Sequence, residues 1–262
     1  MSEECTHDCS TCGSDCDSRT ETTAAPLHAE ASVRRVCAVC GAKGGVGRTT
    51  VASLLAACVQ KKHVQAAVLD ADITGSCVPA AFGLTGRVTP DSFGMFPMET
   101  SSGIQVIGVN LILPDPTDPV IARGALVDNT LKKFWSEVIW EDVDLLLVDM
   151  PADTGEVPLS VMRNIALDGV IVVTEPGRSA AVMTEKTLKM ARALKIPVLA
   201  LVVNHDGANP GLADPTAELA EKYGVDLTVR LPCDPQLAAF MDDGEIEMYN
   251  TDRLDPVIDR LF

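Results

Sequence analysis

A glycine-rich stretch at residues 41–50, Gly-Ala-Lys-Gly-Gly-Val-Gly-Arg-Thr-Thr, carries the residue types that bind a phosphate group. Closely spaced glycines let the backbone curl until successive N–H groups face one anion, and here they are Gly44, Gly45 and Gly47. Thr49 and Thr50 open a helical pattern, and the positive end of a helix attracts the same anion. The stretch matches the pattern G-x-x-x-x-G-K-[ST] from Gly41, except that Arg48 stands where lysine is expected. We therefore predict a phosphate-binding loop with an altered cation.

Acidic and amide side chains follow several apolar, strand-like runs, and they are Asp70, Asp72, Asp149 and Asn204. Parallel strands end at one edge of a sheet and ligands bind beyond that edge, so we expect these side chains to converge on the glycine-rich loop. A strand-end aspartate often caps the next helix. Beside a phosphate loop, however, Asp149 is better suited to hold Mg²⁺, with the Thr49 hydroxyl as a direct ligand. Asp70 and Asp72 are candidates for orienting or deprotonating an attacking water.

The N-terminal tail, residues 1–31, is polar and contains four cysteines with the spacing C-x3-C-x2-C-x3-C: Cys5, Cys9, Cys12 and Cys16. Four thiolates this close together can surround one soft metal centre, either a [4Fe–4S] cluster or a zinc ion. The spacing favours iron–sulfur, because structural zinc sites usually place a long loop between two cysteine pairs. The alternative is a flexible tail with reduced thiols.

The composition excludes several classes of partner. The chain has 262 residues, 47% of them hydrophobic, and a net charge of −16. Such an acidic surface repels nucleic acid and anionic lipid, so we expect no nucleic-acid or membrane partner. The N-terminus does not resemble a signal peptide, and no apolar run approaches the length of a membrane span. We expect a cytoplasmic protein.

From Val33 onward the pattern is that of an α/β domain, which we assign to residues 32–262. Short aliphatic runs without polar alternation predict buried strands at 36–40, 64–69, 104–109, 143–149, 169–173, 197–203 and 226–231. Amphipathic patterns predict helices at 49–62, 126–139 and 180–194. A helix near 215–223 ends at the C-cap signal Gly224, and Asp234-Pro235 indicates the start of another. Alternating strands and helices indicate a doubly wound, mostly parallel sheet of about seven strands with helices on both faces.

These motifs resemble those of a known family. Residues 43–50 are similar to the loop K-G-G-x-G-K-T-T/S of the MinD, ParA and nitrogenase-iron-protein class of dimeric P-loop ATPases. Three stretches resemble motifs of the Mrp (ApbC) iron–sulfur carrier family: D-A-D-I-T-G-S-C-V-P from Asp70, P-V-I-A-R-G from Pro119, and D-L-L-L-V-D-M-P-A-D-T-G-E from Asp144. The resemblance, from about Val33 to Asp243, implies a homodimer that binds and hydrolyses ATP and passes iron–sulfur clusters to apoproteins.

The resemblance also implies roles for individual residues. Lys43 would be the signature lysine that reaches across the homodimer to the partner's ATP. Asp72 would act on the attacking water, Asp149 on Mg²⁺ and Asn204 on the adenine. The nucleotide would be bound by the loop residues Gly44, Gly45, Val46, Gly47, Arg48, Thr49 and Thr50. Family members commonly carry a cysteine-rich N-terminal cluster site, which the tail resembles in kind.

The sequence departs from the family pattern in three places. Arg48 replaces a lysine, and Asp153 stands where a glycine is expected close to the terminal phosphate. A carboxylate there would repel that phosphate. The family's C-x-x-C pair after Asn204 is replaced by His-Asp-Gly-Ala-Asn-Pro-Gly, so we predict that the shared cluster site is absent. Three other cysteines lie in apolar segments and are predicted to pack in the core, namely Cys37, Cys40 and Cys58.

Three functions are therefore considered. The first is a dimeric, ATP-binding iron–sulfur carrier. The second is a relative with impaired hydrolysis that senses nucleotide or assists a more typical paralogue, as Arg48 and Asp153 suggest. The third is a MinD- or ParA-like positioning ATPase, which needs a membrane-binding or DNA-binding surface. The C-terminal segment 252–262 is too short and acidic to anchor well, so the third function ranks last.

Overall fold

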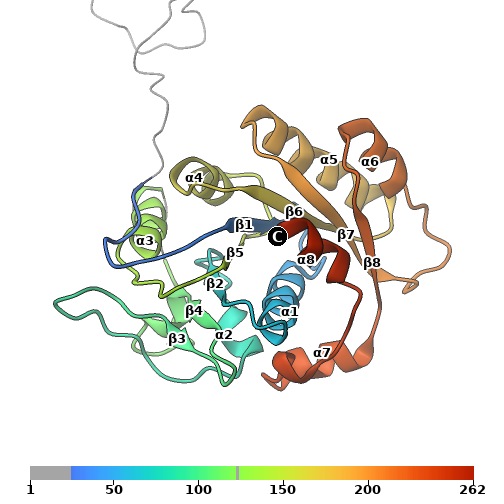
Figure 1. Cartoon of the computed structure of the whole chain (residues 1–262). Helices are drawn as coiled ribbons and strands as arrows, with labels where there is room; N and C mark the ends of the chain where they lie inside the picture. Colours follow the sequence, from blue (N-terminus) through green and yellow to red (C-terminus); the bar gives the residue numbers. More distant parts are fainter. Residues whose placement is uncertain (1–24, 122–123) are drawn as a thin grey trace, which may run out of the picture.

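The computed structural model describes residues 25–121 and 124–262, which form an eight-stranded sheet flanked by helices (Figure 1). The strands are β1 (Val36–Cys40), β2 (Ala66–Asp70), β3 (Met98–Glu99), β4 (Gln105–Ile107), β5 (Leu145–Asp149), β6 (Gly169–Thr174), β7 (Val198–Asp206) and β8 (Thr228–Pro232). Their order is β3-β4-β2-β5-β1-β6-β7-β8, with β3 antiparallel to β4 and the other neighbours parallel. Strand β1, which leads into the glycine-rich loop, therefore lies near the middle of the sheet.

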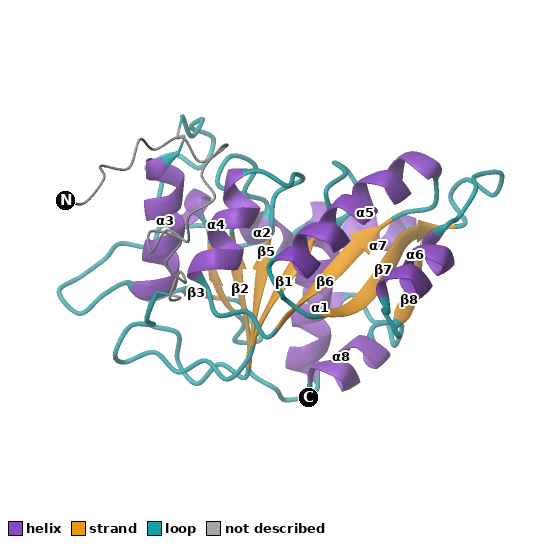
Figure 2. Cartoon of the chain, turned by 90° about the horizontal axis from the view of Figure 1, so that it is seen from above, coloured by secondary structure: helices purple, strands orange, loops and turns teal. Residues whose placement is uncertain are grey.

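Helices cover both faces of this sheet. They are α1 (Arg48–Lys61), α2 (Val78–Ala81), α3 (Ala125–Ser136), α4 (Glu156–Asn164), α5 (Arg178–Ala193), α6 (Thr216–Tyr223), α7 (Pro235–Asp242) and α8 (Asp255–Leu261), with short 3₁₀ turns η1 (Val109–Leu111) and η2 (Ile246–Met248). Figure 2 shows α1 and α8 on one face and α3, α4, α5 and α6 on the other. No helix in the described part of the chain is long and apolar enough to cross a membrane.

The central strands form because their sequences are almost entirely aliphatic and both of their faces are covered. Every residue of β1, β2 and β5 is buried. Helix α1 is also buried from Val51 to Val59, because it packs on β1, β2 and β5 while η2 and α8 contact it as well. The first helix is therefore held firmly, which fixes the loop that precedes it.

The predicted doubly wound, mostly parallel α/β sheet is confirmed, and all seven predicted strands occur. Strand β3 was not expected because it has two residues, and the short helices α2, α4 and α8 were not predicted either, whereas the similarly short α6 and α7 were identified from signals at their ends. Two predicted helix-end signals are present. Gly224 ends α6 with a φ of +68°, and Asp234 caps α7 by accepting a 2.8 Å hydrogen bond from the N–H of Gln236.

The segment before β1 runs along the edge of the sheet where the parallel strands begin. The N–H of Ala25 donates to the carbonyl of Asn164 at 2.8 Å, and the indole N–H of Trp135 donates to the carbonyl of Ala25 at 2.6 Å. Val33 forms a parallel bridge with Val143 just before β5. The cysteines predicted to hold a cluster, Cys5, Cys9, Cys12 and Cys16, lie outside the described residues. The domain boundary between residues 31 and 32 stays a prediction.

Candidate functional site

The glycine-rich loop joins β1 to α1 through left-handed turns that its glycines allow. Gly45 has a φ of +79°, and Gly47, directly before α1, has a φ of +83°. A Cβ at Gly44 or Gly45 would meet no heavy atom within 4 Å, whereas a Cβ at Gly47 would lie 2.2 Å from Asn204 Nδ2. The loop is therefore packed at its base and open at its tip, where a phosphate has room to approach.

Asp149 ends β5 and meets the first turn of α1. Its Oδ2 accepts a 2.6 Å hydrogen bond from the Thr49 hydroxyl, while its Oδ1 is buried and has no hydrogen-bond partner among the described residues. Burial, together with the nearby Asp70 carboxylate, raises the pKa of Asp149 well above its ordinary value. An unsatisfied carboxylate oxygen beside a hydroxyl offers the hard oxygen ligands that Mg²⁺ prefers. The residues present therefore fit this ion.

Asp70 and Asp72, which follow β2, differ in their surroundings. Asp70 is fully buried, and its Oδ2 accepts three hydrogen bonds, from Ser76 Oγ at 2.8 Å and from the N–H groups of Cys77 and Val78 at 3.0 Å. Burial raises the pKa of Asp70 to about 6 despite these bonds. Asp72 is only half-buried and accepts a 2.9 Å hydrogen bond from the N–H of Gly75. Asp70 thus fixes the start of α2, and Asp72 is the better placed of the two to meet a ligand.

Arg48, the first residue of α1, turns its guanidinium back onto the loop. Its Nη1 donates a 2.6 Å hydrogen bond to the carbonyl of Gly41, and its buried Nε has no partner among the described residues. Burial lowers the pKa of Arg48, and nearby carboxylates oppose this effect; they are Asp149, Asp72 and Asp153. The arginine that replaces the expected lysine therefore takes part in the charge balance of this site.

Asn204 lies near the end of β7 and contacts the glycine-rich loop directly. It is buried, and its Nδ2 donates a 2.9 Å hydrogen bond to the carbonyl of Val46. The structure thus brings Asn204, Asp149 and the loop together at one edge of the sheet, as expected from their positions after parallel strands. The adenine contact of Asn204 stays a prediction.

Lys43 makes a contact that the sequence analysis missed. Its ammonium is paired with Glu175 Oε1, and the other oxygen of that carboxylate lies 3.2 Å from Nδ1 of His205. Glu175 follows β6 and His205 lies in β7, so both stand at the same strand-end edge. The rule that identified the other strand-end residues would also have selected Glu175, which directly follows β6.

The cysteines of the described chain form two groups. Cys37, Cys40 and Cys58 are buried, as predicted for core packing. Burial raises the pKa of the Cys37 and Cys40 thiols to about 12, so both are inert, protonated groups. Cys77 and Cys233 are exposed. Within residues 25–121 and 124–262, no three or more His, Cys, Asp or Glu side chains gather as a metal-binding cluster.

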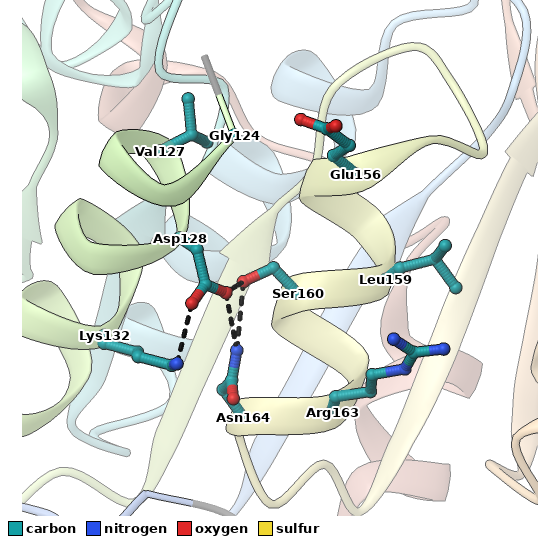
Figure 3. Close-up of a pocket in the computed structure, with 9 residues that line it drawn as sticks. All are labelled: Gly124, Val127, Asp128, Lys132, Glu156, Leu159, Ser160, Arg163 and Asn164. Carbon is teal, nitrogen blue, oxygen red and sulfur yellow. Dashed lines mark hydrogen bonds and ion pairs between the residues drawn. The ribbon is translucent and has the colours of Figure 1, made fainter. Parts of the chain in front are cut away.

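A separate cavity of about 380 Å³ lies between α3 and α4 (Figure 3). Its central group is Asp128, whose Oδ1 accepts hydrogen bonds from Ser160 Oγ and, at 3.0 Å, from Asn164 Nδ2. The Oδ2 of Asp128 pairs with Lys132 Nζ at 2.7 Å. Because protein groups already satisfy this carboxylate, the cluster ties the two helices together and offers no free ligand from Asp128.

The mostly parallel sheet contains a strand, a glycine-rich loop and a helix in sequence, and the Thr49 hydroxyl on this helix bonds to the strand-end carboxylate of Asp149. This arrangement defines a P-loop NTPase. The ParA-type family model described as NUBPL iron-transfer P-loop NTPase matches residues 32–259. The chain belongs to this family. The resemblance to iron–sulfur carriers seen in the sequence motifs is confirmed.

Individual relatives agree with this assignment. The chain is similar to the "Iron-sulfur cluster carrier protein" of Aquifex aeolicus, with 34% identity over 81% of this chain and 61% of that longer protein. The protein of the same name from Methanococcus maripaludis is 31% identical over 93% of this chain and 90% of its own length.

Solved structures show the same fold. A nucleotide-binding protein from Archaeoglobus fulgidus in complex with ADP superposes with a TM-score of 0.74 and 31% identity, covering 85% of this chain and 91% of that one. The cell division ATPase MinD of Pyrococcus furiosus shares the fold alone. It has a TM-score of 0.61 and 18% identity, covering 87% of this chain and 95% of that one.

Proposed function

We propose that the protein is an ATP-binding iron–sulfur carrier, which hydrolyses ATP as a homodimer and transfers clusters to apoproteins in the cytoplasm. The observation that carries the nucleotide part is the contact of Thr49 with Asp149, whose second oxygen is buried and unsatisfied beside an open glycine-rich loop. The iron–sulfur part rests on the four N-terminal cysteines and on family membership. The ADP complex of the Archaeoglobus protein and the names of the relatives support both parts.

Each group at the sheet edge has a role in this proposal. The loop N–H groups from Gly44 to Gly47 bind phosphate oxygens, and the start of α1 adds its positive end. Thr49 and Asp149 hold Mg²⁺, which when bound neutralises charge on the phosphates. Asp72 orients the attacking water. Asn204 contacts the adenine, and Lys43 reaches the nucleotide of a second subunit.

Magnesium dependence tests the nucleotide part. We expect the wild-type protein to bind ATP more tightly with Mg²⁺ than with EDTA, and Asp149→Asn to lose this difference in calorimetric titrations. Asp144→Asn is a matched control, because Asp144 lies just before the same strand at the opposite edge and bonds there to the N–H of Gln65. Wild-type affinity that does not respond to Mg²⁺ would contradict the proposed site.

Iron and sulfide assays on anaerobically purified protein test the carrier part. Serine at all four N-terminal cysteines should remove both iron and sulfide. Serine at the exposed Cys77 or Cys233 should leave both unchanged. A colourless wild-type protein that cannot be reconstituted with a [4Fe–4S] cluster would exclude the carrier function, and stoichiometric zinc would identify the tail as a zinc site instead.

Impaired hydrolysis is a second candidate, and the structure provides a specific reason. Arg48 is bonded back to the Gly41 carbonyl near the exposed Asp153, so a terminal phosphate would meet a planar guanidinium and a nearby carboxylate. Under this candidate, wild-type turnover is low and the double variant Arg48→Lys/Asp153→Gly increases it. Rapid steady-state hydrolysis by the wild type would rule this candidate out.

A further inference from the structure

Lys43, Glu175 and His205 form a cluster of charged and polar side chains at the mouth of the glycine-rich loop. The ammonium of Lys43 pairs with one oxygen of the Glu175 carboxylate, and Nδ1 of His205 lies 3.2 Å from the other oxygen. The side chains of these residues are 35%, 21% and 38% exposed, respectively, so the cluster is half-buried. It is therefore shielded more than a typical surface ion pair.

The sheet topology builds this cluster from three chain segments. Strand β6 lies between β1 and β7, with Cys40 opposite Val172 and Thr174 opposite Val203. The residues that follow these strands, including Lys43 and Glu175, are therefore brought side by side. The cluster is thus a consequence of the fold and does not depend on chance contacts of long surface side chains.

The backbone at His205 is adapted to the cluster. His205 has a φ of +55°, in the left-handed region that few residues other than glycine adopt. The pairing of β7 with β8 is irregular between Val203 and Asp206, which includes this position. A strained conformation that brings an imidazole to a carboxylate is the kind of feature found at functional sites.

The charge of Glu175 allows it to compete for Lys43. Burial acts to raise the pKa of Glu175, but the hydrogen bonds from Lys43 and His205 outweigh it and hold the pKa below its ordinary value. Glu175 is therefore ionised at neutral pH. In the proposed function Lys43 reaches the nucleotide of a second subunit, which an ammonium held at Glu175 of its own subunit does not reach, so Glu175 and that phosphate compete for Lys43.

We propose that Glu175 is a positioning residue that holds Lys43 within its own subunit as a latch, with His205 steadying the carboxylate. Lys43 engages a nucleotide phosphate only after leaving Glu175. This inference rests on the proposed ATP-binding function and adds a regulatory step to it. A nucleotide therefore gains the contact with Lys43 only when its phosphate displaces the Glu175 carboxylate.

The reactivity of Lys43 tests the latch without nucleotide. Acylation of lysines by an N-hydroxysuccinimide ester, followed by mass spectrometry of the free protein, should label Lys43 several-fold faster in Glu175→Gln than in the wild type. Glutamine keeps the size of the side chain and removes its charge. The exposed Lys189, paired with Glu185, serves as an internal reference whose labelling rate should not change.

ATP titrations test the competition itself. We expect Glu175→Gln to lower the ATP concentration at half saturation about tenfold, or about 1.4 kcal/mol. The same substitution in a Lys43→Ala background should have no effect, because the latch then has nothing to hold. Asp206→Asn is the matched control: it removes one negative charge from the same edge, where Asp206 pairs with Arg230 at 3.0 Å. His205→Asn, which tolerates a positive φ, should produce a smaller change in the same direction as Glu175→Gln.

The possible results separate the latch from the proposed function. The latch would be overturned if Glu175→Gln left the labelling rate of Lys43 unchanged, or if this variant bound ATP no more tightly than the wild type. It would also be overturned if Asp206→Asn gave an equal gain in ATP affinity, or if Glu175→Gln gave an equal gain in the Lys43→Ala background. A wild-type protein that binds no ATP, while Glu175→Gln still accelerates labelling of Lys43, would refute the ATP-binding proposal and leave the ion pair as a contact without nucleotide competition.

Discussion

Asp70 and Asp149 lie directly opposite each other as the last residues of the parallel strands β2 and β5. Both side chains are buried, and burial together with the Asp70 carboxylate raises the pKa of Asp149 well above its ordinary value. Two neighbouring buried carboxylates repel each other unless a proton or a cation compensates them. Arg48 provides part of this compensation, and Mg²⁺ at the proposed site would provide more.

The first prediction concerns the pH dependence of stability. The pKa of Asp70 is about 6 in the folded protein and 3.8 for an unperturbed group. Because the folded state binds the proton more tightly, Asp70 favours folding at low pH, and this contribution is lost as the pH rises through 6. In urea unfolding, the free energy of unfolding of the wild type should therefore fall by about 1 kcal/mol between pH 5 and 7.5 through this group. Asp70→Asn should not show this decrease. The exposed Asp226→Asn variant should follow the wild type, and parallel curves for Asp70→Asn and wild type would contradict the prediction.

The second prediction compares two glycines of the loop. Gly45→Ala should cost roughly 1–2 kcal/mol, because only the positive φ opposes the new side chain. Gly47→Ala should cost at least about 1 kcal/mol more, since its Cβ would displace Asn204 from the Val46 carbonyl. Chemical unfolding of the two variants measures the difference. Equal stabilities would mean that Asn204 does not brace the loop.

The third prediction concerns the hydrogen bond that Asp149 accepts from the Thr49 hydroxyl. Thr49→Val leaves both oxygens of a buried carboxylate without a protein donor and should lower the unfolding free energy by about 1–3 kcal/mol in metal-free buffer. Thr49→Ser retains the hydroxyl and should lose much less. If the serine and valine variants unfold at the same denaturant concentration, the hydrogen bond does not contribute to stability.

The fourth prediction concerns the segment before β1. Trp135→Phe removes the indole donor to the Ala25 carbonyl and should lower the free energy of local opening by about 1 kcal/mol. Hydrogen exchange in peptides that start near Ala25 should therefore accelerate about fivefold. Trp140→Phe is a close control, because the indole nitrogen of Trp140 is buried without a partner among the described residues. Equal exchange in the two variants would show that the Trp135 bond does not hold the segment.

Most of the fold followed from the sequence because long aliphatic runs have few alternatives to buried strands. The loop and the carboxylates of Asp149 and Asp72 followed from one topological rule, that parallel strands end at the same edge. Short elements such as β3 and α4 did not follow, since neither a long aliphatic run nor a recognised end signal marks them in the sequence.

The contacts of individual side chains were harder to predict. The bond from Arg48 to the Gly41 carbonyl depends on how a long side chain folds back, and spacing does not encode this. The approach of His205 to Glu175 depends on a positive φ at a residue other than glycine. The buried cap that Asp70 forms for α2 depends on a helix of four residues.

Helix α4 gives the anchor of Ala25 a mechanical consequence. Its first residue, Glu156, follows the loop that carries Asp153 near Arg48, and its last residue, Asn164, accepts the hydrogen bond from Ala25. The helix is a rod of roughly 14 Å between opposite edges of the sheet. A displacement of the Asp153 loop that moved this helix as a rigid unit would therefore also move its far end, where Ala25 is bonded.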